Sequence, residues 1–293
     1  MPEGPEVKVI ADALNQTLRG LTLINLSYDI GSRYAKTTDK NAVWRQQHQQ
    51  FLGLLPLTLH GITTKGKRLI WQFDRDMAIV SFLGMEGHWM FQPEKHSNLW
   101  LDFGRILPTT PQLRVIERTL YYDDSRHFGF IEFCFGRSAL QSALKHIGPD
   151  LLQDAISPEQ WRQVLTRPRL GQKQIGDFLN DQKYFSGIGN YLRAEILYRM
   201  RISPNRKLSQ LTSAEVDGLL LCCQQILRES YELNGHTEYT FFDPLGRKGM
   251  FPVVVYNKNN CPQGHPITVT RKKNKKTDKN EGQAVHWCPQ CQH

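Results

Sequence analysis

Four potential metal ligands crowd the C-terminal end of the chain in two close pairs. Three residues separate Cys261 from His265, 22 residues follow, and two residues separate Cys288 from Cys291. Thiolates and imidazoles in such pairs suit tetrahedral Zn²⁺, and four protein ligands leave no open position for catalysis. The sequence therefore predicts one structural zinc ion. The alternative is that Cys261 and His265 are unpaired surface residues while Cys288 and Cys291 are redox-active.

The N-terminus offers an amine that could act as a nucleophile. Removal of Met1 would expose Pro2 as a free secondary amine, of which a minority is neutral at pH 7. Glu3 and Glu6 lie within one helical turn of this amine and could serve as acids or bases. On composition alone, a polar leader at the start of a helix is the better explanation of the same stretch.

A Gly-x-Gly turn in the middle of the chain is a candidate phosphate site. Gly187 and Gly189 allow close backbone approach, and the N–H groups of the helix that follows from Asn190 can hold a phosphate. A helical connection without a ligand is the alternative. The charge balance favours a polyanionic partner, since 37 Lys and Arg stand against 28 Asp and Glu, a formal net charge of +9.

A basic run lies between the two ligand pairs. On a zinc-stapled hairpin, such a run is expected to contact phosphates, whereas a solvated loop and a nuclear-import signal are the alternatives. The residues concerned are Arg271, Lys272, Lys273, Lys275 and Lys276.

The elements that must position these residues change type along the chain. Apolar spacing predicts a first helix over 5–19 that stops at Gly20. Short runs rich in β-branched and aromatic residues then predict strands without intervening helices, and hence an antiparallel β-sandwich or barrel over roughly residues 1–135. These runs are 21–28, 57–63, 69–73, 78–82, 99–103, 113–122 and 128–135.

Beyond residue 146 the pattern predicts helices over 157–165, 171–182, 190–200 and 212–233, followed by an irregular loop over 234–252. Ser157 and Thr212 have the chemistry of N-caps. We predict domains at 1–146, 147–255 and 256–293. No apolar run approaches the ~20 residues of a membrane span, and the start is not that of a secretory signal, so we expect an intracellular protein that binds no membrane.

Seven motifs occur in an order that is typical of one family. They are MPEGPEV (1–7), TKGKRL (64–69), FLGMEG (82–87), DSRHFG (124–129), IGPD (147–150), GIGNYLRAE (187–195) and WCPQC (287–291). The chain resembles the formamidopyrimidine-DNA glycosylase / endonuclease VIII family over essentially its whole length, and it is nearer to the endonuclease VIII branch. The resemblance implies an α+β multidomain fold with a catalytic β-sandwich that carries an N-terminal helix, a helix–two-turn–helix domain and a C-terminal zinc finger hairpin.

The resemblance also implies catalytic roles. Pro2 would be the Schiff-base nucleophile, Glu3 the general acid that opens the sugar ring, and Lys67 a hairpin lysine that assists proton transfer and holds a phosphate. Glu6 is the further acidic group that we place with them. Lys67 is otherwise a solvated hairpin cation.

Four further residues would bind DNA. Asn190 matches a phosphate-binding asparagine, and Met85, Arg126 and Phe128 match residues that fill the gap left by an everted base. Ordinary core packing is the alternative for Met85 and Phe128. Where many relatives have an arginine five residues before the third zinc ligand, this chain has Gln283.

We therefore predict a monomeric bifunctional DNA glycosylase/AP lyase that acts on double-stranded DNA with oxidised bases or abasic sites, wherever the cell keeps its DNA. Oxidised pyrimidines and ring-opened purines are the favoured substrates, with 8-oxoguanine open, and strand cleavage follows by β- or β,δ-elimination. One alternative is a non-catalytic zinc-dependent nucleic-acid-binding relative. The other is a lyase limited to abasic sites.

Overall fold

The computed structural model describes residues 2–30, 32, 34, 39–107, 110–237, 241–271 and 283–293. The chain divides into two compact units, each defined by residues that contact one another in space. The strand unit comprises Met1–Pro2, Glu6–Lys145 and Phe242–Lys248, and the helical unit comprises Glu3–Pro5, His146–Phe241 and Gly249–His293. No helix in these described ranges is long and apolar enough to cross a membrane.

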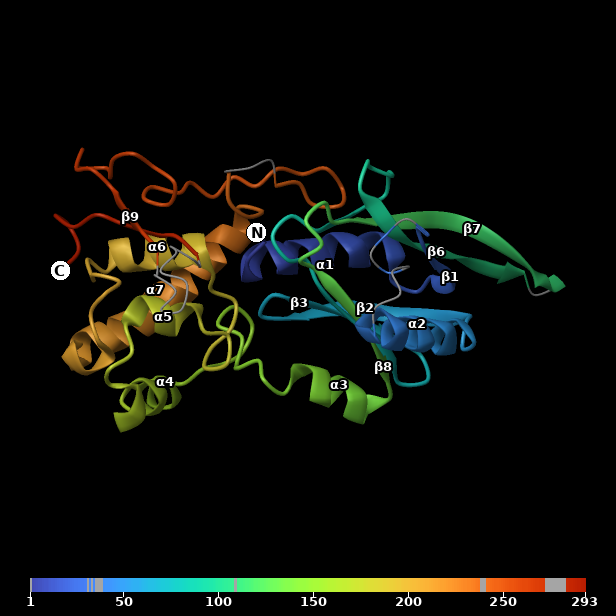
Figure 1. The fold of residues 1–293 in the computed structure, drawn as a ribbon, viewed down its shortest axis with the longest axis horizontal. Coiled ribbons are helices and arrows are strands. Elements are labelled where there is room, and N and C mark those ends of the chain that lie inside the picture. The colour runs from blue at the N-terminus through green and yellow to red at the C-terminus, as the bar shows by residue number, and fades with distance from the viewer. Residues whose placement is uncertain are drawn as a thin grey trace. The chain divides into compact units, whose positions relative to one another are not determined.

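The strand unit contains one eight-stranded antiparallel sheet within its described residues, in the order β5-β7-β6-β1-β2-β3-β4-β8. Most of these strands are labelled in Figure 1. All seven predicted runs form strands, and the short β5 is an addition. The strands are β1 (Thr22–Tyr28), β2 (Leu57–Lys65), β3 (Arg68–Phe73), β4 (Met77–Phe82), β5 (His88–Met90), β6 (Ser97–Leu107), β7 (Thr110–Asp123) and β8 (Phe130–Phe135).

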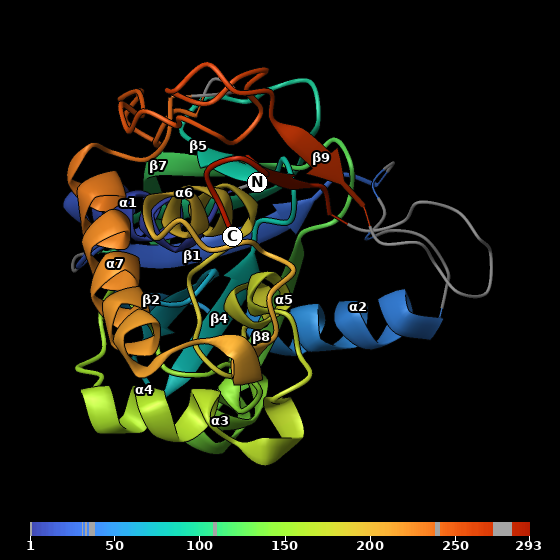
Figure 2. The ribbon, with the colours of Figure 1, turned by 90° about the vertical axis from the view of Figure 1, so that its left-hand side faces the viewer.

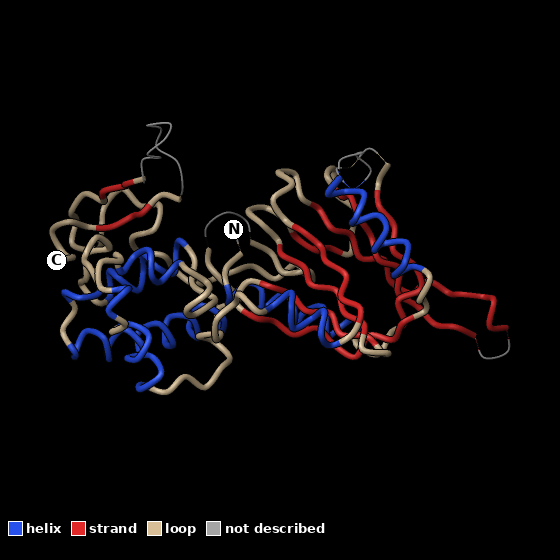
Figure 3. Tube along the Cα trace, turned by 60° about the horizontal axis from the view of Figure 1, so that its bottom comes forward, coloured by secondary structure: helices blue, strands red, loops and turns tan. Residues whose placement is uncertain are grey.

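The sheet consists of two four-stranded halves joined by only two residue pairs, between β1 and β2. Side chains from both halves share one core. The ring of Trp71 on β3 lies 5.1 Å from that of Trp89 on β5, and Trp89 lies 4.9 Å from Tyr122 on β7. All three are almost completely buried. This arrangement is the predicted β-sandwich (Figure 3).

Three helices accompany the strands: α1 (Gly4–Leu18), α2 (Asp39–Leu52) and α3 (Arg137–Leu144). The predicted first helix is confirmed, and it ends before Gly20, whose φ of 85° only glycine adopts freely. Helices α2 and α3 were not predicted from the sequence. The polar run of α2 shows no clear apolar stripe, and its attachment is tertiary: the Trp44 indole donates to the carbonyl of Ile131, 2.9 Å away.

We expect one histidine on α2 to make the stability of the strand unit depend on pH. His48 Nε2 donates to the carbonyl of Leu26 at 3.0 Å, and its Nδ1 has no partner among the residues that the structure describes. Its ring stacks on that of Trp44, with centroids 5.2 Å apart. Burial lowers the pKa of the His48 imidazole below its usual range, and the bond to Leu26 opposes this effect.

We expect the free energy of unfolding to fall as the pH decreases below about 6.5. In that range His48 binds a proton in the unfolded chain, whereas His48 in the folded chain stays neutral because its pKa is lower. His48→Gln keeps a donor for Leu26 but does not titrate, so it should flatten the pH dependence. Urea unfolding between about pH 7.5 and 5.5 measures this, with exposed His60→Gln as the control. Equal pH dependence in the wild type and His48→Gln would contradict the expectation.

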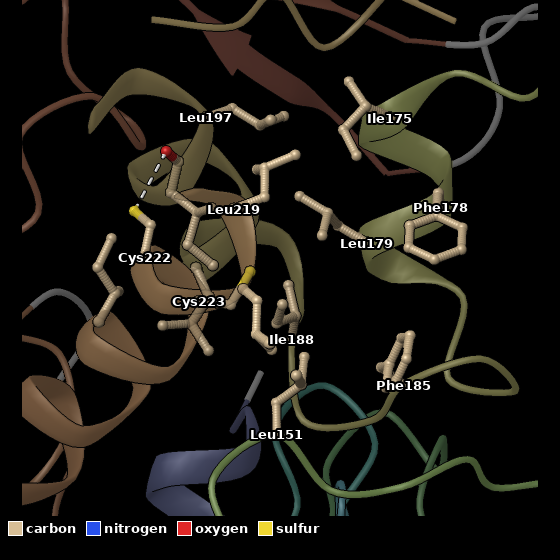
Figure 4. Packing of buried hydrophobic residues seen from close by; sticks show 14 of the residues in the cluster. Leu151, Ile175, Phe178, Leu179, Phe185, Ile188, Leu197, Leu219, Cys222 and Cys223 are labelled. Atoms are coloured by element: carbon tan, nitrogen blue, oxygen red, sulfur yellow. Dashed lines mark hydrogen bonds between the residues drawn. The ribbon is translucent and has the colours of Figure 1, made fainter. Parts of the chain in front are cut away.

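The helical unit contains four α-helices within its described residues, and they share one apolar core (Figures 2 and 4). They are α4 (Pro158–Leu165), α5 (Ile175–Asn180), α6 (Asn190–Arg199) and α7 (Ser213–Glu232). Both predicted N-caps are confirmed. The Ser157 and Thr212 side chains each accept a backbone N–H three residues on, and Gln160 and Glu215 return the bond to complete capping boxes.

The predicted helix over 171–182 is wrong in extent, since α5 covers only Ile175–Asn180. The chain first forms the 3₁₀ turn Pro168–Leu170. Gln174 is then extended, and Ile175 N–H donates to the carbonyl of Arg206 at 2.8 Å. Pairing with this distant segment replaces the first helical turns.

The predicted Cys/His module folds as a small hairpin in the helical unit. Its strands β9 (Thr268–Thr270) and β10 (Val285–Trp287) share three residue pairs. The final residues attach it to the helices: Gln292 Nε2 donates to the carbonyl of Ile202 at 3.0 Å, and Ser203 N–H donates to that of His293 at 2.9 Å.

Candidate functional site

The Glu3 carboxylate is anchored at the start of α6. It accepts backbone N–H groups of Gly189, Tyr191 and Leu192, at 2.6, 3.0 and 3.3 Å, and is 2% exposed. The N-terminus of a helix favours an anion because its first N–H groups lack partners within the helix. The prediction that these N–H groups bind a phosphate is therefore wrong for these three, because Glu3 occupies them.

Two glycines allow this approach. Gly4 N–H donates to the carbonyl of Gly187 at 2.8 Å, and a Cβ on Gly4 would lie 2.8 Å from the Cα of Gly187. Gly187 itself has a φ of 107°. The Gly-x-Gly turn thus binds the chain's own N-terminal segment. This contact holds Glu3, the residue that follows Pro2, in place.

Asn190, the first residue of α6, lies in the same turn and is oriented by Arg193. The Arg193 guanidinium donates to Asn190 Oδ1 and, at 3.1 Å, to the carbonyl of Ala284 on the finger hairpin. Burial lowers the pKa of Arg193, and the charges of Glu3 and Asp177 oppose this effect. With Oδ1 engaged, the amide offers its Nδ2 hydrogens to another acceptor, as a phosphate contact requires.

For the DNA glycosylase/AP lyase that the sequence predicts, we expect Asn190→Ala to slow strand cleavage by about 10- to 100-fold, because a misplaced sugar leaves the attack geometry. The slope of the logarithm of the DNA-binding constant against the logarithm of salt concentration should stay unchanged, since a neutral amide releases no counterion. Single-turnover cleavage and binding over a salt series measure both quantities. An unchanged cleavage rate in Asn190→Ala would rule out the positioning role.

The three predicted gap-filling residues lie on two neighbouring loops of the strand unit. The loop of Met85 approaches that of Phe128 so closely that a Cβ on Gly84 would lie 2.5 Å from the Phe128 carbonyl carbon. Met85 is 38% and Phe128 53% exposed, so core packing does not account for either. The Arg126 guanidinium lies 5.0 Å from the Phe128 ring centroid.

Glu86 joins these two loops. Its carboxylate accepts from the hydroxyl of Ser125 at 2.7 Å and lies 3.6 Å from the Arg126 guanidinium. This role was not predicted, because nothing in the local sequence connects Glu86 to a loop some forty residues away.

Pro2, Glu6 and Lys67 all belong to the strand unit. Pro2 is half-buried ahead of α1, and Glu6 in the first turn of α1 is fully buried. Lys67 lies in the turn between β2 and β3 and is 8% exposed, so the alternative of a solvated cation does not describe it. The cooperation of these three residues belongs to the proposal below.

The four predicted metal ligands converge, with donor atoms all within 4.8 Å of one another. Cys261 Sγ lies 3.9 Å from Cys291 Sγ, and His265 Nδ1 lies 3.3 Å from Cys291 Sγ. Sulfurs at the corners of a tetrahedron around a metal at ~2.3 Å are about 3.8 Å apart, so the spacing fits a bound ion. His286 is not part of the cluster, and its Nδ1 accepts the N–H of Asn257. The cluster can hold one metal ion.

Two more features of the finger bear on the predictions. Gln283 Oε1 accepts from Asn180 Nδ2 at 2.8 Å, so the residue at the usual arginine position is tied to α5. Of the basic run, Arg271 is described and exposed, whereas Lys272, Lys273, Lys275 and Lys276 lie outside the described residues.

Glu195 was also not predicted, although it belongs to a quoted motif. Its carboxylate accepts the N–H groups of Val254, Val255 and Tyr256 at 3.0, 3.0 and 2.8 Å, which fixes the segment leading to the finger. Burial raises the pKa of Glu195, and these bonds oppose the rise. Its partners lie about sixty positions away, too distant in sequence to infer from a local pattern.

Two known protein domains match consecutive parts of this chain. The formamidopyrimidine-DNA glycosylase N-terminal domain matches residues 1–131, and the formamidopyrimidine-DNA glycosylase H2TH domain matches residues 147–241. Endonuclease 8 of Escherichia coli strain K12 / DH10B is 27% identical over 299 residues, with 100% of both chains covered.

Solved structures of Fpg proteins have a similar fold. The MutM (Fpg) protein of Thermus thermophilus superposes with a TM-score of 0.79 at 26% identity, over 99% of this chain and 98% of that one. Lactococcus lactis Fpg in complex with DNA containing an abasic site gives a TM-score of 0.80 at 26% identity, over 99% of both chains.

The fold and site define a two-unit protein with an H2TH domain and a Cys₃His finger. The chain belongs to the formamidopyrimidine-DNA glycosylase family.

Proposed function

We propose that the protein is a bifunctional DNA glycosylase/AP lyase of base excision repair. The anchored Glu3 carboxylate carries this proposal: it lies directly after Pro2, and three N–H groups at the start of α6 hold it. The full-length similarity to Endonuclease 8 supports the same activity.

In the proposed reaction, the Pro2 nitrogen attacks C1′ of the damaged nucleotide, and the base leaves with the glycosidic electron pair and takes a proton from solvent. The proton that the Pro2 nitrogen loses passes to the Glu3 carboxylate, which then donates it to the ring oxygen as the C1′–O4′ bond breaks. The nitrogen lone pair forms the second bond to C1′, which gives an iminium that withdraws electrons. The 2′ proton then becomes acidic, and its loss expels the 3′ phosphate. Lys67 assists this proton transfer, and Glu6 is the second carboxylate near the amine.

DNA recognition is assigned to residues outside this reaction. Met85, Arg126 and Phe128 fill the gap left by the everted base, and Glu86 holds Arg126 until the orphaned base replaces it. Asn190 contacts a phosphate beside the lesion. The run 271–276 supplies non-specific phosphate contacts.

The metal in the finger is one structural Zn²⁺ held by Cys261, His265, Cys288 and Cys291. Four protein ligands exclude a catalytic role for the ion and let it fix the hairpin. The domains are proposed as 1–146, 147–255 and 256–293, and the active form as a monomer located with the cell's DNA.

A panel of duplexes tests the proposal, each with one lesion: an oxidised pyrimidine, a ring-opened purine, 8-oxoguanine or an abasic site. We expect base release and strand cleavage, fastest on the first two, with β-elimination dominant because Gln283 lacks a charge. Cleavage of abasic DNA alone would favour the limited lyase, and binding without cleavage would favour a non-catalytic relative. Either result would overturn the proposal.

A further inference from the structure

Three potential metal ligands outside the sites described above meet in the strand unit: His88, Glu94 and Asp123. Their donor atoms, one imidazole nitrogen and two carboxylate oxygens, all lie within 4.8 Å of one another. Asp123 on β7 pairs with His88 on β5 and with Ser97 on β6, so β7 lies between the other two strands (Figure 2). Glu94 N–H donates to Ser97 Oγ at 2.8 Å. Strand pairing therefore brings the three ligands together.

His88 has one ring nitrogen directed at this cluster. Its Nδ1 lies 2.9 Å from the carbonyl oxygen of Glu86, and a carbonyl can only accept, so Nδ1 carries a hydrogen. Metal-ligating histidines are held in the same way, by a carbonyl or carboxylate on the other nitrogen. In the neutral ring, Nε2 then presents a lone pair to Glu94 Oε2, 3.3 Å away. Two acceptors at this distance repel each other unless a proton or a metal ion lies between them.

Asp123 gives the cluster a buried negative charge, since the residue is only 5% exposed. Its Oδ2 accepts the N–H of His96 at 2.8 Å, and its Oδ1 makes no hydrogen bond or ion pair with any residue that the structure describes. Within the same described ranges, Glu94 forms an ion pair only with His88. The two carboxylates thus lack a Lys or Arg partner, and a buried carboxylate without a cation is costly.

The donor set indicates the kind of ion. Carboxylates suit hard divalent cations, and an imidazole adds a preference for transition metals over Ca²⁺ and Mg²⁺. Three protein ligands leave further coordination positions for water. The set differs from the Cys₃His cluster of the finger, whose thiolates select a softer ion such as Zn²⁺. A divalent transition metal such as Mn²⁺ therefore fits the cluster in the strand unit.

The ligands lie at the base of the two loops that carry the predicted gap-filling residues. His88 comes three residues after Met85, and Asp123 comes five residues before Phe128. We propose that His88, Glu94 and Asp123 bind one divalent transition-metal ion, which braces these two loops. The ion joins β5, β7 and the segment between β5 and β6.

Titration of the full-length protein with Mn²⁺ at pH 7.5 tests the proposal, with free Mn²⁺ measured by electron paramagnetic resonance. We expect one Mn²⁺ per chain with a Kd on the order of 10–100 μM. His88→Asn and Asp123→Asn should each weaken binding at least about tenfold. His96→Asn replaces an exposed histidine of the neighbouring segment, outside the cluster, and is the matched control. It should change Kd less than about twofold.

Hydrogen exchange tests the bracing of the loops. At a Mn²⁺ concentration of ten times Kd, any opening that releases the ion is suppressed about tenfold, so amide exchange in 84–88 and 123–128 should slow by up to that factor. His88→Asn should show no such slowing. Absence of saturable Mn²⁺ binding would overturn the proposal, because His88 and Glu94 then share only a proton. Equal effects of His88→Asn and His96→Asn would also overturn it, and binding without slower exchange would overturn the bracing role. None of these measurements depends on the proposed enzymatic activity.

Discussion

Glu3→Gln is expected to slow base excision by about 10²- to 10⁴-fold, the range for loss of a general acid. A glutamine has one acceptor oxygen, so it cannot accept all three N–H groups of Gly189, Tyr191 and Leu192 as the carboxylate does. The variant loses both the proton and the positioning. Single-turnover base release on a lesion-containing duplex measures the effect.

Two comparisons separate chemistry from stability in this experiment. Cleavage of DNA with a preformed abasic site should fall much less, because an abasic sugar is a hemiacetal that opens to its aldehyde in water without Glu3. Glu215→Gln removes another carboxylate that accepts a backbone N–H at a helix start, on α7, and should lower the free energy of unfolding without slowing base release. Equal loss of activity in both variants would assign Glu3 a purely structural role.

Cys288→Ser is expected to remove the proposed zinc ion and most of the DNA affinity. Without the ion, the hairpin has only three β9–β10 residue pairs and little apolar core. Structural zinc supplies about 10–16 kcal/mol of apparent binding free energy in finger peptides, so the finger should unfold locally. Elemental analysis and duplex binding measure the two losses.

Cys222→Ala is the matched control, because this buried thiol lies on α7, outside the cluster. It should keep one zinc ion per chain and bind DNA as the wild type does. Zinc content that stays at one ion per chain in Cys288→Ser would contradict the proposed ligand set.

Local chemistry explains how much of the fold could be predicted. Seven strands of the sheet, the capped helices α4 and α7, and each of the two pairs of metal ligands follow from patterns within a few residues of one another. Helix α2 did not follow, because the Trp44–Ile131 bond that attaches it spans 87 positions. The length of α5 did not follow either, because pairing with Arg206 decides where the helix begins.

The residues of the candidate site also fall into two groups: those that the sequence named and those that only the structure identified. Motif resemblance named Glu3 and Asn190, but only the structure shows that three N–H groups at the start of α6 bind the Glu3 carboxylate rather than a phosphate. Arg193 beside Asn190, and Glu86 beside Arg126, act through contacts that no local pattern encodes. The sequence named residues that have intrinsic chemistry, whereas the residues that orient them were identified only in the structure.

The most direct test of the central claim is to trap the covalent intermediate on Pro2. The protein is incubated with lesion-containing duplex and borohydride, digested, and the cross-linked peptide is identified by mass spectrometry. We predict that Met1 is absent from active protein and that the reduced adduct is on the Pro2 nitrogen, with much less adduct in Pro2→Gly. An adduct on a lysine, or active protein that retains Met1 and so has an acylated Pro2 nitrogen, would contradict the proposed mechanism.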